Sequence, residues 1–151
     1  MTATAAGSRS IDLVRRFNDD VYNGRQYDRI TEYQSDEYVQ HGPLSDMAIH
    51  GSEESLGMLR LFHGAFSDLT GTPEFSFSDD AGQYVCSAYT YRGTHDGEFM
   101  GLAPTGIECE VRGVTINRIE DDTVAEAWFH VDLLGLMQQL DLAPPMDGLT
   151  G

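Results

Sequence analysis

The sequence predicts an α+β domain in which a cone-shaped, curved antiparallel sheet wraps around N-terminal helices. Apolar residues recur at helical spacing up to about residue 66, and strand-like alternation dominates from residue 72. Because helices come first and a run of long strands follows, the order argues against a doubly wound parallel sheet. The open end of such a cone is a natural small-molecule pocket.

Three helices are expected before the strands. Ser10 is a good N-cap, and apolar residues recur at helical spacing until Asn23-Gly24 ends the first helix. Residues 27–33 can form a short second helix, and residues 38–41 read as a short extended piece. Ser52 is the expected N-cap of the third helix, whose apolar stripe runs from residue 56 to residue 66.

The second half of the chain predicts strands over residues 84–94, 106–119 and 124–131, after a shorter alternating piece around residues 75–77. Gly113 lies inside the longest of these strands and marks a place for a bulge or bend. An amphipathic helix over residues 133–140 closes the fold, and Pro144-Pro145 follows it.

The chain of 151 residues is long enough for one domain. We expect a disordered lead over residues 1–9, a single domain over residues 10–142 and a tail over residues 143–151. Cys86 and Cys109 have no metal-type spacing, so neither a disulfide scaffold nor a zinc ribbon is expected. No stretch has the length and hydropathy of a membrane helix or secretory signal, which predicts a cytoplasmic protein.

The charge balance is strongly acidic, with 25 Asp and Glu against 9 bases and a formal net charge of −16. Every base is Arg, and Lys is absent. Such a surface repels phosphate backbones and anionic lipid, so nucleic acid and membranes are not expected as partners. Screening in a salty cytoplasm would remove the self-repulsion, which favours a halophilic protein. A merely acidic protein from a GC-rich genome is the alternative.

The C-terminal half carries a recognisable pattern. Its residues are Gly93–Gly101, Ala103–Gly106, Gly113, Arg118–Asp121, Trp128, Asp132 and Leu134–Leu140. This pattern resembles the SnoaL-like polyketide cyclase (ester cyclase) family of the nuclear-transport-factor-2-like (NTF2-like) superfamily, and the resemblance covers roughly residues 10–142. It implies a cone-shaped α+β barrel, a homodimer or higher homo-oligomer, and no metal or organic cofactor. Cyclases of this family close a ring by intramolecular aldol condensation, with a carboxylate as acid/base.

This chain departs from the pattern of the resembled cyclases at two positions. Their catalytic Asp on the last strand aligns with Phe129, which cannot move a proton. A His on their preceding strand aligns with Thr115. Ring closure by the usual residues is therefore not expected.

His41, His130 and Asp132 are the candidate catalytic residues. His130 and Asp132 lie two positions apart, so a regular strand would point both to one face and form a His–carboxylate general base. Alternatively, Asp132 caps the last helix and His130 faces a partner subunit. His41 precedes Gly-Pro near the expected pocket mouth, where it is either an acid/base or a loop residue bonded to backbone.

The expected ligand-binding residues are mostly aromatic. Tyr89 and Tyr91 share one strand face, and their hydroxyls could stabilise an enolate if that face lines the pocket. His95 is either a pocket residue or a residue that orders its loop. The full set is Phe17, Phe62, Tyr89, Tyr91, His95, Phe99 and Phe129. No helical His and acid spacing predicts a metal site.

Three functions are consistent with these residues. The first is a protein that binds a small, largely apolar carbonyl compound and catalyses cofactor-free proton transfer, as a cyclase or isomerase. The second is a non-catalytic ligand-binding protein, which Phe129 favours. A structural role, with the sheet face as an oligomer interface, is a third. The catalytic hypothesis predicts that His130→Ala abolishes turnover without affecting folding.

Overall fold

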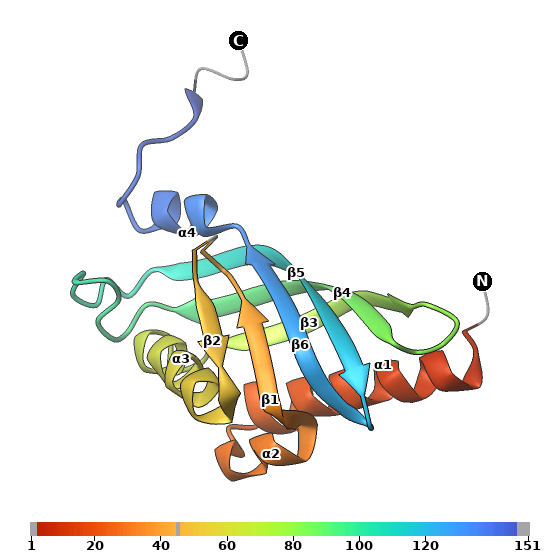
Figure 1. Ribbon diagram of the computed structural model, residues 1–151. Coiled ribbons are helices and arrows are strands. Elements are labelled where there is room, and N and C mark those ends of the chain that lie inside the picture. The colour runs from red at the N-terminus through yellow and green to blue at the C-terminus, as the bar shows by residue number, and fades with distance from the viewer. Residues whose placement is uncertain (1–2, 45, 148–151) are drawn as a thin grey trace.

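The computed structural model describes residues 3–44 and 46–147. Its six strands form one sheet in the order β2-β1-β6-β5-β4-β3. The sheet is curved and unclosed, with α1, α2 and α3 gathered on one side and α4 at one end (Figure 1). The strands are β1 (Gln34–His41), β2 (Ala48–His50), β3 (Thr70–Ser78), β4 (Tyr84–Thr94), β5 (Glu108–Glu120) and β6 (Thr123–Val131). The α-helices are α1 (Ala5–Phe17), α2 (Ile30–Tyr33), α3 (Gly51–Ala65) and α4 (Leu133–Gln139). The predicted α+β fold is confirmed.

The first helix starts earlier than the sequence predicts. Thr4, not Ser10, is the N-cap, and its side chain accepts a hydrogen bond from the Gly7 amide at 3.0 Å. Ser10 Oγ instead donates to the carbonyl oxygen of Gly82 at 2.5 Å. Contact with the loop between β3 and β4 thus stabilises the part of α1 that precedes Ser10. The prediction of a disordered lead is therefore wrong from Ala5 onward. Residues 1–2 of that lead and 148–151 of the predicted tail lie outside the described residues.

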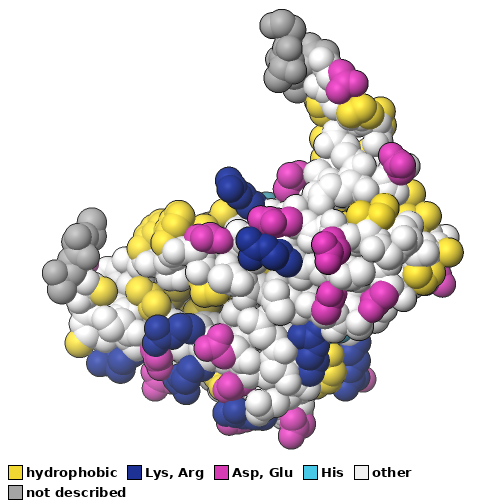
Figure 2. Space-filling model, turned by 180° about the vertical axis from the view of Figure 1, so that it is seen from behind, with side chains coloured by type: hydrophobic (Ala, Val, Ile, Leu, Met, Phe, Trp, Pro, Cys, Tyr) yellow, Lys and Arg dark blue, Asp and Glu magenta, His cyan; other side chains and the backbone are white. Residues whose placement is uncertain are grey.

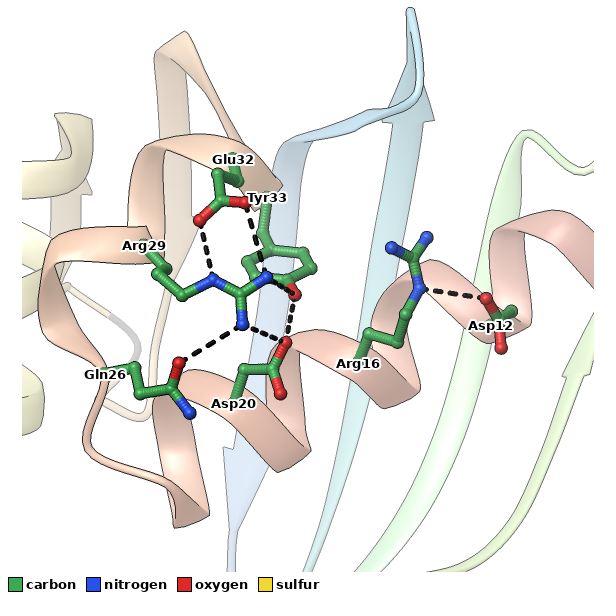
Figure 3. A network of polar contacts seen from close by, with 7 residues as sticks. All are labelled: Asp12, Arg16, Asp20, Gln26, Arg29, Glu32 and Tyr33. Carbon is green, nitrogen blue, oxygen red and sulfur yellow. Dashed lines mark hydrogen bonds and ion pairs between the residues drawn. The ribbon is translucent and has the colours of Figure 1, made fainter.

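A polar network fastens the end of the first helical segment to α2 (Figure 3). After α1 the chain continues as a π-helical turn (Asn18–Asn23) that carries Asp20, and a 3₁₀ turn (Tyr27–Arg29) precedes α2. Asp20 accepts a hydrogen bond from the hydroxyl of Tyr33, which is buried. Arg29 lies 2.9 Å from Asp20 and 2.7 Å from Glu32. Asp20 therefore joins helical segments that are separate in the sequence.

The start of α3 also differs from the prediction. The helix begins at Gly51, and His50, not Ser52, occupies the N-cap position. Glu54 Oε2 accepts a hydrogen bond from the His50 amide at 2.7 Å. An acidic side chain in the first turn thus satisfies the backbone donor of the N-cap residue itself.

The last three strands match their predicted positions closely, and β4 has the predicted bounds. β1 and β3 are longer than predicted, and β2 was not predicted. Gly113, however, makes no bulge, because it pairs in regular register with Tyr89 and Val131. A Cβ at Gly113 would come within 2.8 Å of the Tyr91 ring. The glycine therefore makes room for an aromatic side chain. The irregularity in β5–β6 pairing lies instead at Arg118 and Ile119.

One strand pair runs parallel, whereas the prediction was an antiparallel sheet. β1 pairs with β6 in parallel, with Gln40 opposite Ala127 and His41 opposite Trp128. The reason is the crossover of α3, which carries the chain from β2 to the far edge of the sheet. The antiparallel run from β3 to β6 then returns to β1 in the same direction. No helix of the described segments is long and apolar enough to cross a membrane.

Candidate functional site

A cavity of about 160 Å³ lies between the helices and the sheet. A cavity of roughly 150 Å³ lined by aliphatic and aromatic side chains is large enough to hold benzene. Most of its wall is apolar, with side chains from α1, α3, α4 and the inner face of the sheet. Its aromatic and aliphatic lining includes Phe17, Tyr22, Leu59, Phe62, Phe66, Tyr89, Tyr91, Val111, Phe129, Val131, Leu133 and Leu136.

The last strand turns its apolar face to this cavity. Ala127, Phe129 and Val131 line it, and His130 lies exposed on the opposite face of the strand. The alternation of side chains along β6 requires this, because neighbours point to opposite faces. The prediction that His130 and Asp132 line the cavity as a pair is therefore wrong.

Asp132 has a structural role that the sequence offered as the alternative. Its side chain accepts a hydrogen bond from the Gly135 amide at 2.8 Å and caps α4. His130 and Asp132 both border a separate groove on the outer face of the sheet, together with Arg92 and Arg112. They are brought near each other there, away from the aromatic cavity.

His41 also lies outside the aromatic cavity. Its Nε2 is 2.6 Å from Glu126 Oε2, and its ring stacks on Trp128 with the centroids 5.3 Å apart. Arg118 Nε donates to Glu126 as well, at 3.2 Å. The hydrogen bond with His41 and then the Arg118 guanidinium hold the pKa of Glu126 below its usual range. The Glu126 carboxylate is thus stabilised in its charged form on the outer face of β6.

The predicted ligand-binding residues divide into two groups. The structure places Phe17, Phe62, Tyr89, Tyr91 and Phe129 in the cavity wall. His95 and Phe99 are buried but are not part of that wall.

His95 and Phe99 pack beside the cavity instead. His95 Nδ1 is 2.9 Å from Thr105 Oγ1, and its ring packs against Phe66. Phe99 packs against Phe66 and Phe62, with centroid distances of 5.6 and 6.0 Å. The structure thus supports the reading of His95 as a residue that orders its loop.

Three tyrosines and Phe129 form an aromatic cluster at the cavity. Tyr89 and Tyr91 stack with ring centroids 5.6 Å apart, and Tyr91 meets Phe129 edge-on at 5.9 Å. Tyr22 lies 5.7 Å from Tyr91. Burial raises the pKa of each of the three phenols above its ordinary value. Their hydroxyls therefore stay protonated at neutral pH and can donate hydrogen bonds.

A polar part of the wall was not foreseen from the sequence. Gln34, Tyr38 and Gln40 of β1 and Ser55 of α3 line the cavity. Gln34 Nε2 donates to Ser55 Oγ at 3.0 Å, and the Tyr38 hydroxyl donates to Gln40 Oε1 at 2.9 Å. A signal existed for Ser55, which precedes Leu59 by one helical turn on the buried stripe of α3.

The cavity wall holds few groups that can move a proton near neutral pH. Among the described residues that line the cavity there is no Asp, Glu or His, and the one charged residue, Arg92, has an exposed side chain that pairs with Glu110. Burial raises the pKa of the Cys109 thiol, which also lines the cavity. Nowhere in residues 3–44 and 46–147 do three His, Cys, Asp or Glu side chains gather closely enough to hold a metal. The described residues of the wall therefore offer apolar surface, hydroxyl groups and amides rather than carboxylates or imidazoles.

Comparison with solved structures shows the same fold in proteins with different assigned activities. A protein from Jannaschia sp. CCS1, assigned as a SnoaL-like polyketide cyclase, superposes with a TM-score of 0.84 at 23% identity, covering 96% of this chain and 99% of its own. IdmH from Streptomyces antibioticus, assigned as a polyketide cyclase, gives 0.76 at 24% identity over 87% and 98%. AclR from Streptomyces galilaeus, assigned as a hydroxylase, gives 0.80 at 23% identity over 91% and 88%.

Sequence comparison is informative at the level of the family. No curated protein matches the chain significantly. The family model for the SnoaL-like polyketide cyclases matches residues 12–140, which is most of the chain and includes every element that builds the cavity. With the fold shared by these structures, the match confirms the resemblance seen in the C-terminal half. The chain belongs to the SnoaL-like polyketide cyclase family, within the NTF2-like superfamily.

Proposed function

We propose that this protein binds a small, largely apolar molecule that carries a carbonyl group, and that it does so without catalysing a reaction. One observation supports this most: the cavity wall includes no carboxylate or imidazole of the described residues. Phe129 lines the cavity at the position where the resembled cyclases have their acid. Proton abstraction next to a carbonyl needs a base within hydrogen-bond reach.

The wall suits such a ligand in two ways. Phe17, Phe62 and Phe129 offer apolar area, whose burial favours binding. Tyr89 and Tyr91 keep their protons, so a hydroxyl can donate to a carbonyl oxygen of the ligand. These five residues are the ligand-binding set that we propose.

The test uses 1-indanone, a small bicyclic ketone, followed by NMR chemical shifts of the backbone amides. We expect saturable shifts around β5 and β6. Val131→Phe fills the cavity and should abolish them. Val114→Phe places the same bulk on the outer face of the sheet, where Val114 is exposed, and should leave binding unchanged. Equal binding by both variants would overturn the proposal.

The catalytic hypothesis is tested on the same ketone. A base in the cavity would exchange the protons next to the carbonyl for deuterium in heavy water, faster than buffer alone. We expect no such acceleration. If exchange is accelerated, alanine variants of His41, His130 and Asp132 show whether these residues carry it, and the non-catalytic proposal fails.

We infer that a second copy of the chain covers the outer sheet face. Phe75 and Phe77 are 61% and 57% exposed there, and Val114 and Ile116 continue the apolar surface across β5. Exposed apolar patches of this kind mark interaction sites. Phe77→Arg should shift the protein from dimer to monomer in light scattering coupled to gel filtration. A wild-type monomer at high concentration would contradict the inference.

We also propose that the protein works in a salty cytoplasm. Acidic side chains are scattered over the face seen from behind, with Arg between them (Figure 2). The net charge of −16 already counts every Arg, and exposed ion pairs such as Arg15–Asp12 and Arg92–Glu110 add little stability. Salt would screen the remaining repulsion.

A further inference from the structure

The side chain of Gln34 has a hydrogen-bond acceptor that none of the described residues uses. Gln34 begins β1, is 4% exposed and lines the cavity. Its Nε2 donates to Ser55 Oγ, whereas its Oε1 is buried and bonds to none of the described residues. Buried carbonyl oxygens are rarely left in this state, because the lost bond to water is not replaced.

Gln34 shares the cavity wall with other polar side chains, among them those of Tyr38, Gln40 and Ser55. Gln40 Nε2 lies 3.4 Å from the carbonyl oxygen of Gly42, which can only accept. Gln40 Oε1 therefore faces Tyr38, whose hydroxyl donates to it. Gln34 Nε2 donates to Ser55 Oγ at 3.0 Å. The Gln34 amide nitrogen thus faces Ser55, and the amide oxygen is the atom left without a partner among the described residues.

We propose that Gln34 determines the specificity of the cavity by accepting a hydrogen bond from a hydroxyl or N–H group of the bound molecule. This inference rests on the proposed ligand-binding function and narrows the ligand class. Tyr89 and Tyr91 offer donors, so they suit an acceptor such as a carbonyl oxygen. Gln34 offers an acceptor, so it requires a donor. The ligand is then a small apolar compound that carries both, such as a hydroxy ketone or a phenolic ketone.

The test compares two probes of nearly equal size, 2-naphthol and 2-methylnaphthalene. They differ in a hydroxyl and a methyl group, so the ratio of their dissociation constants reports on hydrogen bonding. Gln34→Met keeps the length of the side chain and removes the acceptor. We expect the preference for naphthol, relative to wild type, to fall about tenfold in this variant, as for one lost hydrogen bond with its desolvation cost.

Gln83→Met is the matched control, because it makes the same substitution at an exposed glutamine that does not line the cavity. This variant should keep the wild-type ratio. An equal drop in both variants, or no drop in Gln34→Met, would overturn the inference. If neither probe nor 1-indanone binds wild type, the proposed function fails instead. If wild type binds 1-indanone and Gln34→Met keeps the wild-type ratio of the naphthol and methylnaphthalene dissociation constants, only the proposed role of Gln34 is wrong.

A measurement on the wild type guards against a misfolded variant. The side-chain amide of Gln34 gives its own pair of proton–nitrogen NMR signals. Naphthol should shift them at saturation, and methylnaphthalene should shift them much less. Equal shifts with both probes would mean that Gln34 Oε1 does not accept a hydrogen bond from the probe, for example because it bonds to a water molecule. That result would overturn the inference.

Discussion

His63 lies on α3 with little contact with water, at 7% exposure. Its Nδ1 is 2.6 Å from the Tyr27 hydroxyl, and its Nε2 is buried with no partner among the described residues. Burial, and secondarily the charge of Arg25, lower the pKa of His63 to about 4. The imidazole is therefore neutral in the folded protein well below physiological pH. An unperturbed histidine has a pKa of about 6.5.

This burial makes stability depend on pH. Between pH 6.5 and pH 4 the unfolded chain binds a proton at His63 that the folded chain does not, so the free energy of unfolding falls as pH falls. From pH 7.5 to pH 5 the loss is roughly 2 kcal/mol. Urea unfolding should show a smaller loss in His63→Phe. His50→Gln, at an exposed histidine, should keep the wild-type dependence; identical profiles in all three proteins would refute this account.

Variants of Asp132 can distinguish a structural role of this residue from a catalytic one. Asp132→Ala removes the cap of α4 and should lower stability by about 1 kcal/mol. Asp132→Ser restores a capping oxygen and should recover most of it, which thermal melting can measure. Binding of 1-indanone should be unaffected in both. A serine variant as unstable as the alanine variant would mean that capping is not what Asp132 contributes.

At the scale of elements, Asp20 connects the π-helical turn to α2 through the buried hydroxyl of Tyr33 and the guanidinium of Arg29. Tyr33→Phe removes the hydroxyl that bonds to the carboxylate and should cost about 1 kcal/mol or slightly more. Arg16, also drawn in Figure 3, pairs with Asp12 in a half-exposed position, so Arg16→Gln should be nearly neutral. Chemical denaturation measures the free energy of unfolding of both variants. Equal losses would mean that the buried hydrogen bond of Tyr33 contributes no more than the half-exposed ion pair of Arg16.

The elements also show what the sequence could predict. The positions of β4, β5 and β6 were predicted well because β-rich segments alternate there with clear turn signals. The three-residue strand β2 was not predicted, since it is too short to show an alternating pattern. The start of α1 was not predicted either, because residues 5–9 carry no apolar periodicity. Their helical state depends on contacts such as Thr4 Oγ1 with the Asp80 carbonyl oxygen, 76 positions away. Such tertiary contacts leave no local pattern.

The inner face of β6 was open to prediction. Ala127, Phe129 and Val131 are all apolar, whereas Glu126 and His130 on the other face are polar, so the binary pattern alone favours the observed orientation. The prediction that His130 is a catalytic residue in the cavity is inconsistent with that pattern. Gln34 could not have been singled out, because its free acceptor follows from burial and from the bond that its amide nitrogen makes to Ser55 of α3.

For the whole molecule, the excess of acids predicts a response to salt. In dilute buffer the excess acidic side chains, which give the net charge of −16, repel one another. Added salt screens this repulsion, since the Debye length shortens from about 10 Å at 0.1 M to about 3 Å at 1 M. The melting temperature should therefore rise as potassium chloride approaches molar concentration. Calorimetry over a salt series measures it. A melting temperature that stays constant or falls would remove the inference of salt adaptation.

The parallel pair of β1 and β6 has a consequence for the route by which the chain folds. The strands from β3 to β6 join neighbours along the chain, whereas His41 meets Glu126 across 85 positions. Closing so long a loop costs chain entropy before any contact compensates for it. We expect β1 to dock after the folding transition state, with low φ-values for Val39→Ala and high ones for Val85→Ala. Since β1 carries Gln34, Tyr38 and Gln40, the polar wall of the cavity would then be the last part of the binding site to assemble.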